Sequence, residues 1–329
     1  MEDKKKVLVV TTLLGYGDLL YLTPFIRFLT MAGLSVDVWA VNTEPFFDNP
    51  YINELTPIVA KGVTIPPTYF THWNLQKFDT TSNNIHTVDY FTVKTCGITL
   101  RNHEKDLVLV WKDSDIEYCE SLLKQHHLVS NRSIHCNFVV ISPVITWPSR
   151  TLPLSFYKEL ITEIQETGDK VVLVGKSFAH ATSGLISPEL AKQETKQLYP
   201  ASEFPGAIDF TNKFSFAQLG AFYSLSKLAI NSENGNMVAS CTNSNCWNLY
   251  MPTLVAPEYR LPSRKGSQSY RTVVVKNEKD YFPPSDYTKL VGGNPISPAN
   301  APVLIPKVED VITAYYRIDQ LFRENRNYV

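Results

Sequence analysis

The sequence of 329 residues lacks a hydrophobic run of the ~20 residues that a membrane span needs. The polar start Met-Glu-Asp-Lys-Lys-Lys leads directly into the short apolar residues 7–10, so we expect no signal peptide. We therefore expect no stable membrane insertion and a cytoplasmic location.

Cysteine is scarce as well, with five residues that are scattered along the chain. An odd, scattered set predicts free thiols in a reducing compartment rather than a framework of disulfides. Cys241 and Cys246 are near each other, but their spacing is not that of a zinc site. We expect no metal site.

An excess of charge of either sign is absent too, since the formal net charge is -1. The protein as a whole therefore has no strong attraction to nucleic acid or to an anionic membrane. One segment differs locally: residues 260–271 contain Arg260, Arg264, Lys265 and Arg271 and no acid. Such a segment either contacts a phosphate or forms a solvated loop, and the sequence leaves both interpretations open.

Among the features that are present, the turn around Gly15, Gly17 and Asp18 organises the first half of the chain. The apolar residues 7–10 before it predict a buried parallel strand, and apolar positions at helical spacing follow it. The glycines therefore lie at a strand-to-helix turn, where open α/β folds place their sites. Asp18 is either a cap of this helix or a catalytic base.

Alternating strand and helix patterns in both halves predict two doubly wound α/β domains that face each other across a cleft. The pattern restarts at Phe138, so we place the boundary after residue 134 and expect domains over 1–134 and 135–306. The predicted strands cover residues 7–10, 35–41, 58–60, 107–111, 138–142, 170–175, 228–231 and 247–250. The predicted helices cover residues 49–55, 84–96, 113–127, 153–168, 215–224 and 308–324, whereas 62–81 is expected to be irregular.

Several short motifs occur in an order that resembles one known family. They are Gly17-Asp18 with Thr23-Pro24 and Arg27, Asn49-Pro50-Tyr51-Ile52-Asn53-Glu54, Trp147-Pro148-Ser149-Arg150, Ser232-Glu233-Asn234-Gly235-Asn236-Met237, and Tyr250-Met251-Pro252-Thr253. Together they resemble glycosyltransferase family 9, the ADP-heptose:lipopolysaccharide heptosyltransferases. The resemblance implies a GT-B fold of two Rossmann-like domains, with an acceptor-binding domain first and a nucleotide-sugar-binding domain second. It also implies that the last helix, in residues 307–329, returns to the N-terminal domain.

The resemblance further implies a role for each matching residue. Asp18 is the general base, which accepts a proton from the acceptor hydroxyl. The acceptor side includes Thr11, Thr12 and Gly17. The donor-binding residues are Ser142, Arg150, Glu233, Asn234, Gly235 and Asn236. Glu233 holds sugar hydroxyls, and Arg150 with the backbone amides of residues 234–236 stabilises the diphosphate. No cofactor or metal is implied, because the nucleotide sugar is a co-substrate.

Four positions depart from the family pattern, so we expect a divergent member. Arg150 replaces a lysine, Glu233 an aspartate, Val238 a histidine and Met251 a glycine. Three functions stay open: transfer to a saccharide such as a lipopolysaccharide core, transfer to a hydroxymethylated base in DNA, and nucleotide-sugar binding without turnover.

Overall fold

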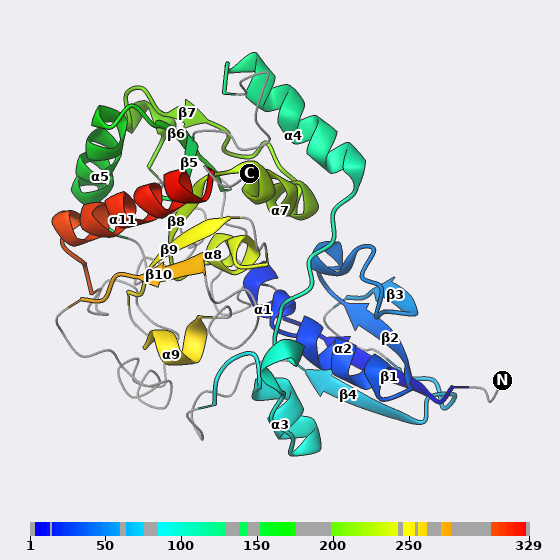
Figure 1. Ribbon diagram of the computed structural model, residues 1–329. Helices are drawn as coiled ribbons and strands as arrows, with labels where there is room; N and C mark the ends of the chain where they lie inside the picture. Colours follow the sequence, from blue (N-terminus) through cyan, green and yellow to red (C-terminus); the bar gives the residue numbers. More distant parts are fainter. Residues whose placement is uncertain are drawn as a thin grey trace.

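The computed structural model contains two parallel β-sheets, each covered by helices (Figure 1). It describes residues 4–13, 15–59, 64–75, 85–128, 138–143, 152–175, 199–242, 246–253, 256–261, 271–277 and 304–326. The two sheets belong to two α/β units that lie against each other, so the predicted fold class is confirmed.

The first sheet has the order β3-β2-β1-β4, with all strands parallel. The strands are β1 (Lys6–Thr11), β2 (Ser35–Ala40), β3 (Glu54–Pro57) and β4 (Thr71–Leu75). The helical segments are α1 (Tyr16–Leu20), α2 (Thr23–Met31), η1 (Glu44–Phe46), α3 (Tyr90–Cys96) and η2 (Asn102–Glu104). The central strand β1 is apolar and buried on both faces, as its unbroken hydrophobic run predicts.

The second sheet is larger and has the parallel order β10-β9-β8-β5-β6-β7. Its strands are β5 (Phe138–Ile141), β6 (Lys170–Leu173), β7 (Ile208–Asp209), β8 (Leu228–Ser232), β9 (Trp247–Met251) and β10 (Thr272–Val274). Its helical segments are α5 (Leu154–Glu166), η4 (Ala201–Glu203), α7 (Phe216–Leu225), α8 (Gly235–Ser240), α9 (Pro257–Arg260) and α11 (Val308–Arg326).

Alternate residues of the second sheet enter two separate hydrophobic clusters. Phe138 and Val140 of β5 pack with α7 and α8 on one face, whereas Val139 and Ile141 pack with α5 and α11 on the other. This alternation is what the two-residue period of a strand imposes on a sheet covered on both sides.

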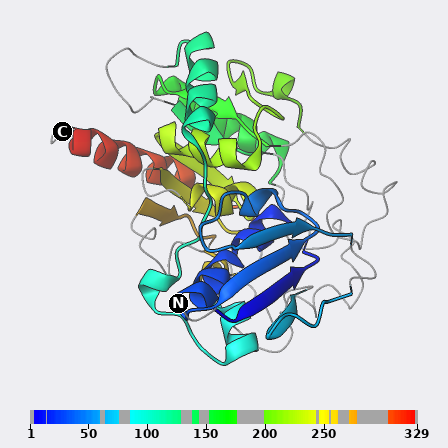
Figure 2. The same ribbon diagram turned by 90° about the vertical axis from the view of Figure 1, so that its right-hand side faces the viewer.

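The helix α4 (Asp113–Gln125) corrects the predicted domain boundary. We expected it in the first domain, but its buried Cys119 and Leu123 pack against α7 of the second. The chain crosses between the domains before α4, along an extended segment in which Leu107 and Leu109 are buried in the same cluster. Figures 1 and 2 show this crossing from α3 to α4. The boundary after residue 134 is therefore wrong, because apolar contacts assign α4 to the second domain.

The last helix, α11, is also placed differently from our expectation. It packs on α5 and β9 of the second domain, through Val311, Ile312 and Tyr315, and does not return to the first domain. Polar contacts add to this attachment, since the Tyr315 hydroxyl lies 2.8 Å from the Thr167 hydroxyl, and Lys227 lies 2.6 Å from Asp319. The apolar face of α11 therefore finds its partner within the domain whose chain it ends.

Three local predictions also differ from the structure. Residues 49–55 are not helical, because β3 begins at Glu54. The side-chain amide of Asn53, just before β3, donates a hydrogen bond to the buried carboxylate of Asp37 over 2.7 Å. The region that we expected to be irregular contains β4, and residues 107–111 form no strand. The strands and helices with long apolar patterns, by contrast, lie close to their predicted positions.

Candidate active site

Each sheet has one place where the order of its strands reverses, and open α/β folds bind ligands at such places. In the first sheet this place lies between β1 and β4, and in the second between β5 and β8. The chain leaves β1 toward Gly15 and Asp18, leaves β5 at Ser142, and leaves β8 at Glu233. Most of the predicted site residues thus lie at the carboxyl ends of these three strands.

The turns from the two domains meet where helix α1 packs against helix α8. A methyl group built on Gly17 would lie 3.2 Å from the Cα of Gly235 and 3.2 Å from a methyl carbon of Val238. A side chain at position 17 would require these neighbouring atoms to shift by a few tenths of an ångström. The structure therefore brings the predicted acceptor-side turn next to the predicted donor turn.

Asp18 is the third residue of α1 and is partly exposed. The cap position belongs to Gly15, and α1 has no side-chain cap, so Asp18 does not occupy the N-cap position that one interpretation gave it. Its carboxylate lies over Gly15, since a Cβ built there would be 2.9 Å from Oδ2 of Asp18. A partly exposed carboxylate at this turn is accessible to a substrate hydroxyl.

The turn after β8 is fixed by its own side chains. Glu233 is 3% exposed, and its Oε2 accepts a hydrogen bond from the Thr253 hydroxyl over 3.2 Å. Asn234 caps α8, because its side chain accepts from the Met237 amide over 2.8 Å. Asn236 donates to the hydroxyl of Ser142 and so joins the turn after β8 to the turn after β5.

A third strand end lies beside this pair. Gly175 follows β6 with a φ of 130°, in the region that favours glycine. A Cβ on Gly175 would be 3.5 Å from the Ser142 hydroxyl and 3.7 Å from the side-chain nitrogen of Asn236. The predicted donor residues Ser142, Gly235 and Asn236 therefore gather at one edge of the second sheet.

The predicted acceptor-side residues differ in exposure. Thr11 is completely buried, and its hydroxyl accepts from the Leu13 amide over 3.2 Å, which stabilises the turn after β1. Thr12 is partly exposed and Gly17 is buried against α8. Because Thr11 and Gly17 are buried, the partly exposed Thr12 and Asp18 are the predicted acceptor-side and catalytic residues that an acceptor can reach.

Arg150 lies outside the described residues, as do Arg264 and Lys265, so their predicted contacts stay predictions. Arg260 and Arg271, the two described cations of the basic segment, lie near opposite ends of two neighbouring parallel strands. Arg260 ends α9, which follows the carboxyl end of β9, whereas Arg271 directly precedes the amino end of β10. These two cations do not form one patch.

Tyr21 is a residue of the interface that sequence reasoning missed. It is 2% exposed, and its hydroxyl donates to the carbonyl of Arg260 over 2.5 Å. Burial raises its pKa far above the ordinary value, and the charges of Asp18 and Glu233 act in the same direction. Its position three residues after Asp18, on the same side of the turn, was the available signal.

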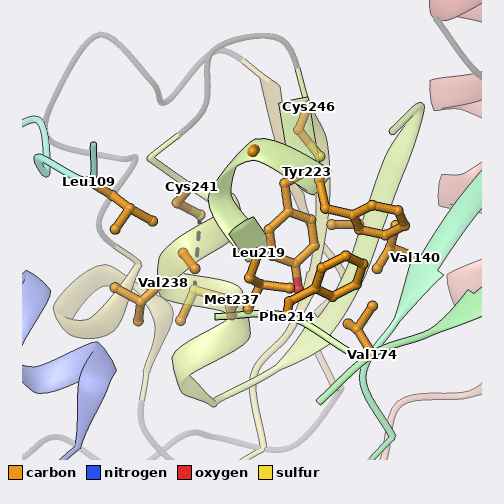
Figure 3. Close-up of a cluster of buried hydrophobic side chains, with 14 of the residues drawn as sticks. Leu109, Val140, Val174, Phe214, Leu219, Tyr223, Met237, Val238, Cys241 and Cys246 are labelled. Atoms are coloured by element: carbon orange, nitrogen blue, oxygen red, sulfur yellow. Dashed lines mark hydrogen bonds between the residues drawn. The ribbon is translucent and has the colours of Figure 1, made fainter. Parts of the chain in front are cut away.

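Val238 occupies the position of the family's histidine and is 4% exposed. Figure 3 shows it beside Met237 in a cluster that also includes Leu109 and Cys241. Leu20, Tyr21 and Val88 of the first domain join the same cluster. The face that α8 turns toward the first domain is therefore apolar, so this position packs the interface and offers no hydrogen bond.

Within the described ranges, no group of three metal-ligating side chains is close enough to hold a metal ion. No helix in this part of the chain has the length and hydropathy of a membrane span. The described cysteines Cys96, Cys119, Cys241 and Cys246 are free thiols.

Comparisons by sequence find no matching family model and no matching curated protein. Comparison of structures does find similar proteins. A family 9 glycosyl transferase from Veillonella parvula DSM 2008 matches with a TM-score of 0.63 and 16% identity, over 97% of this chain and 98% of that one. The ADP-heptose lps heptosyltransferase II of E. coli matches with a TM-score of 0.57 and 15% identity, over 95% and 99%.

A third similar structure is the iron-containing dodecameric glycosyltransferase TibC of enterotoxigenic E. coli H10407. Its TM-score is 0.60 at 15% identity, over 95% of this chain and 76% of that one. A further TibC structure contains ADP-D-beta-D-heptose and matches with a TM-score of 0.59. At these identities the likeness establishes the fold: the chain has the GT-B architecture that is seen in glycosyltransferases of family 9.

Proposed function

We propose that the protein is a glycosyltransferase that moves a sugar from a nucleotide-diphosphate donor to a hydroxyl of a saccharide acceptor. The observation that carries the proposal is the contact of Gly17 with Gly235, which brings the helix of Asp18 next to the turn of Glu233. The likeness to family 9 structures supports it, because those proteins share this architecture over nearly their whole length.

In the proposed reaction, the acceptor oxygen forms a bond to the anomeric carbon of the donor sugar. The bond from that carbon to the phosphate oxygen breaks, and the nucleoside diphosphate leaves with the electron pair. Asp18 takes the proton of the acceptor hydroxyl, a step for which its partial exposure is suited.

The donor side must stabilise the negative charge that develops on the leaving diphosphate. The backbone amides of residues 234–236 and the guanidinium of Arg150 supply donors for this charge in our proposal. Glu233, fixed by Thr253, orients hydroxyls of the sugar. The reaction as proposed uses no cofactor or metal, so EDTA is expected to leave the transfer rate unchanged.

We also propose a cytoplasmic location. The free thiols of the described cysteines fit a reducing compartment.

A ligand screen by thermal shift tests the donor class. A ligand that binds only the folded state at one hundred times its Kd stabilises it by ~2.7 kcal/mol, so the Tm rises. ADP, UDP, GDP and their sugars are compared with the matching monophosphates and with inorganic phosphate as controls. We expect one nucleoside diphosphate to raise the Tm, and Asn236→Ala and Arg150→Ala to reduce that rise. If none of the diphosphates raises the Tm, the donor assignment is wrong.

The identified donor is then incubated with saccharide acceptors and with duplex DNA that contains hydroxymethylated bases. Transfer to a saccharide supports the proposal. Transfer to DNA alone contradicts the proposed acceptor class, and donor binding without transfer or hydrolysis identifies a binding protein instead.

A further inference from the structure

Helix α1 and its C-cap, Tyr21, contact the second domain at several points. The ring of Tyr16 lies edge-to-face on Phe216 of α7, with 4.9 Å between ring centroids. Gly17 lies against Gly235 and Val238, and the hydroxyl of Tyr21 donates to Arg260. The short helix that carries Asp18 is thus held by contacts across the domain interface as well as by Leu19 in the core of its own domain.

One carboxylate joins three elements at the first of these contacts. Oε2 of Glu44 accepts a hydrogen bond from the Tyr16 hydroxyl over 2.7 Å. The other oxygen, Oε1, accepts from the backbone amide of Phe216, a residue 172 positions away. Glu44 belongs to η1 after β2, so its side chain connects η1 and α1 of the first domain to α7 of the second.

The partners of Glu44 suit a carboxylate. Phe216 is the first residue of α7, and the amides at a helix N-terminus carry partial positive charge that attracts an anion. Burial and the bond to Glu44 raise the pKa of Tyr16 far above its ordinary value, so its hydroxyl stays protonated and remains a donor. The α7 helix has its own cap in Ser215, so Glu44 is an additional contact that comes from the other domain.

We propose that Glu44 is a positioning residue for Asp18: by holding Tyr16 against the start of α7, it sets the orientation of α1 between the two domains. Successive residues of a helix are ~100° apart, so Tyr16 and Asp18 point to nearly opposite sides of α1. Fixing Tyr16 against α7 therefore turns the Asp18 carboxylate away from α7. This inference rests on the proposed function for the role of Asp18, whereas the interdomain contact of Glu44 does not depend on it.

The test compares Glu44→Ala, Glu44→Gln and Tyr16→Phe in the full chain. Glu44→Ala removes both contacts, and Glu44→Gln keeps an oxygen acceptor for the Phe216 amide. Tyr16→Phe keeps the ring contact and removes only the hydroxyl. Glu104→Gln is the matched control, because Glu104 lies in η2 and pairs with Arg101 within its own domain over 2.6 Å.

For Glu44→Ala we expect kcat to fall about tenfold or more, because small misplacements of a reacting group are costly, while the donor Kd stays within about twofold. Small-angle X-ray scattering is expected to give a larger radius of gyration, which a local defect would not produce. Glu44→Gln and Tyr16→Phe should lie between wild type and Glu44→Ala in both measurements, and Glu104→Gln should match wild type.

An unchanged kcat and radius of gyration in folded Glu44→Ala would overturn the proposal. Equal losses in kcat and donor affinity would also overturn it, because they indicate general damage. If Glu44→Ala does not fold, the proposal is judged by whether Glu44→Gln and Tyr16→Phe lower kcat and raise the radius of gyration while the donor Kd stays unchanged. If wild type transfers no sugar, the proposed function fails separately, and scattering alone then decides whether Glu44 holds the domains.

Discussion

The two strand-to-helix units that meet at the interface, β1–α1 and β8–α8, resemble each other in form and differ in how they are held. Each ends a strand at a reversal of strand order and enters a short helix at a glycine-containing turn. The β8–α8 unit is fixed from within its own domain, by the Asn234 cap and by the bond of Glu233 to Thr253. The β1–α1 unit has no side-chain cap and, besides contacts within its own domain, packs against α7 and α8 of the other domain.

This difference suggests a division of roles under the proposed function. A unit that is fixed within its domain can hold a donor in a constant geometry. The position of a unit that also contacts the other domain, with Asp18 partly exposed, depends on how the two domains pack together. Further contacts across the same interface link residues 86–87 to the end of α9: both the amide and the hydroxyl of Thr87 donate to the carbonyl of Tyr259, over 2.9 and 2.8 Å.

The largest expected effect comes from removing the basicity of Asp18. Asp18→Asn keeps the size of the side chain, so folding and donor binding should be retained. General base catalysis is typically worth ~10²–10⁴ in rate, so sugar transfer should slow by about a hundredfold or more. The measurement is kcat with a saturating donor. Asp113→Asn, an exposed aspartate at the first position of α4, is the control and should transfer at the wild-type rate. Wild-type turnover by Asp18→Asn would remove Asp18 from the proposed chemistry.

The next effect concerns the two glycines at the contact. In Gly17→Ala the new methyl group meets the backbone of Gly235 at 3.2 Å, so we expect a loss of ~1–3 kcal/mol from overpacking. In Gly235→Ala the nearest atom is the Gly17 nitrogen at 3.5 Å, an ordinary contact. Alanine is favoured over glycine in a helix by up to ~1 kcal/mol, so Gly235→Ala should be neutral or stabilising.

Urea unfolding of both glycine variants provides the measurement. No loss of stability in Gly17→Ala would mean that the interface is not as tight at Gly17 as the distances indicate.

A smaller effect is expected from the cap of α8. Asn234→Ala removes the acceptor for the Met237 amide and should cost ~0.5–2 kcal/mol, while Asn234→Asp keeps an acceptor and should recover most of it. Ser215→Ala, which removes the cap of α7, is the matched comparison. Urea unfolding of the three variants is the measurement. No loss in Asn234→Ala would show that the β8–α8 unit is held by packing alone.

The smallest effect is a difference in thiol reactivity, which reports how firmly α8 is held. Cys241 is the C-cap of α8 and is 1% exposed. Cys246 is fully buried, and this burial raises the pKa of its thiol to about 12. At pH 8 the Cys246 thiol is therefore protonated and unreactive in the folded state, since the thiolate is the nucleophile. Cys96 is partly exposed. Iodoacetamide labelling followed by mass spectrometry should show Cys96 modified well before Cys241 and Cys246. Equal rates would indicate frequent opening of this region.

The parts of the fold that could be predicted are those with a strong local pattern. Strands β1, β5, β6 and β8 each contain a run of at least three consecutive buried apolar residues, as parallel strands covered on both faces do: residues 7–10, 138–141, 171–173 and 228–230. The helix predicted over residues 215–224 is found as α7, where Ser215 caps the helix and forms a capping box with Gln218. The left-handed Gly97 ended α3 at the expected residue.

Other elements could not be predicted because their pattern is weak. Strand β4 has the sequence Thr-His-Trp-Asn-Leu, and only its last residue is buried. Strand β4 forms by pairing with the free edge of β1, whose backbone groups need hydrogen-bond partners. This pairing depends on residues more than 60 positions apart, so the local sequence of β4 does not predict it. Residues 107–111 are apolar as a strand would be, yet Leu107 and Leu109 are buried by the second domain while the chain crosses between the sheets.

The sequence by itself determined the buried strands, the capped helices and the order of motifs around Asp18 and residues 232–237, because each depends on residues that are close in the chain. Only the tertiary structure decided that α4 and α11 belong to the second domain, that Gly17 lies against Gly235, and that Glu44 reaches Phe216. Those contacts join residues far apart in sequence. The apolar face of a helix requires a partner but does not specify which of two similar sheets provides it, and the shape of the assembled domains makes that choice.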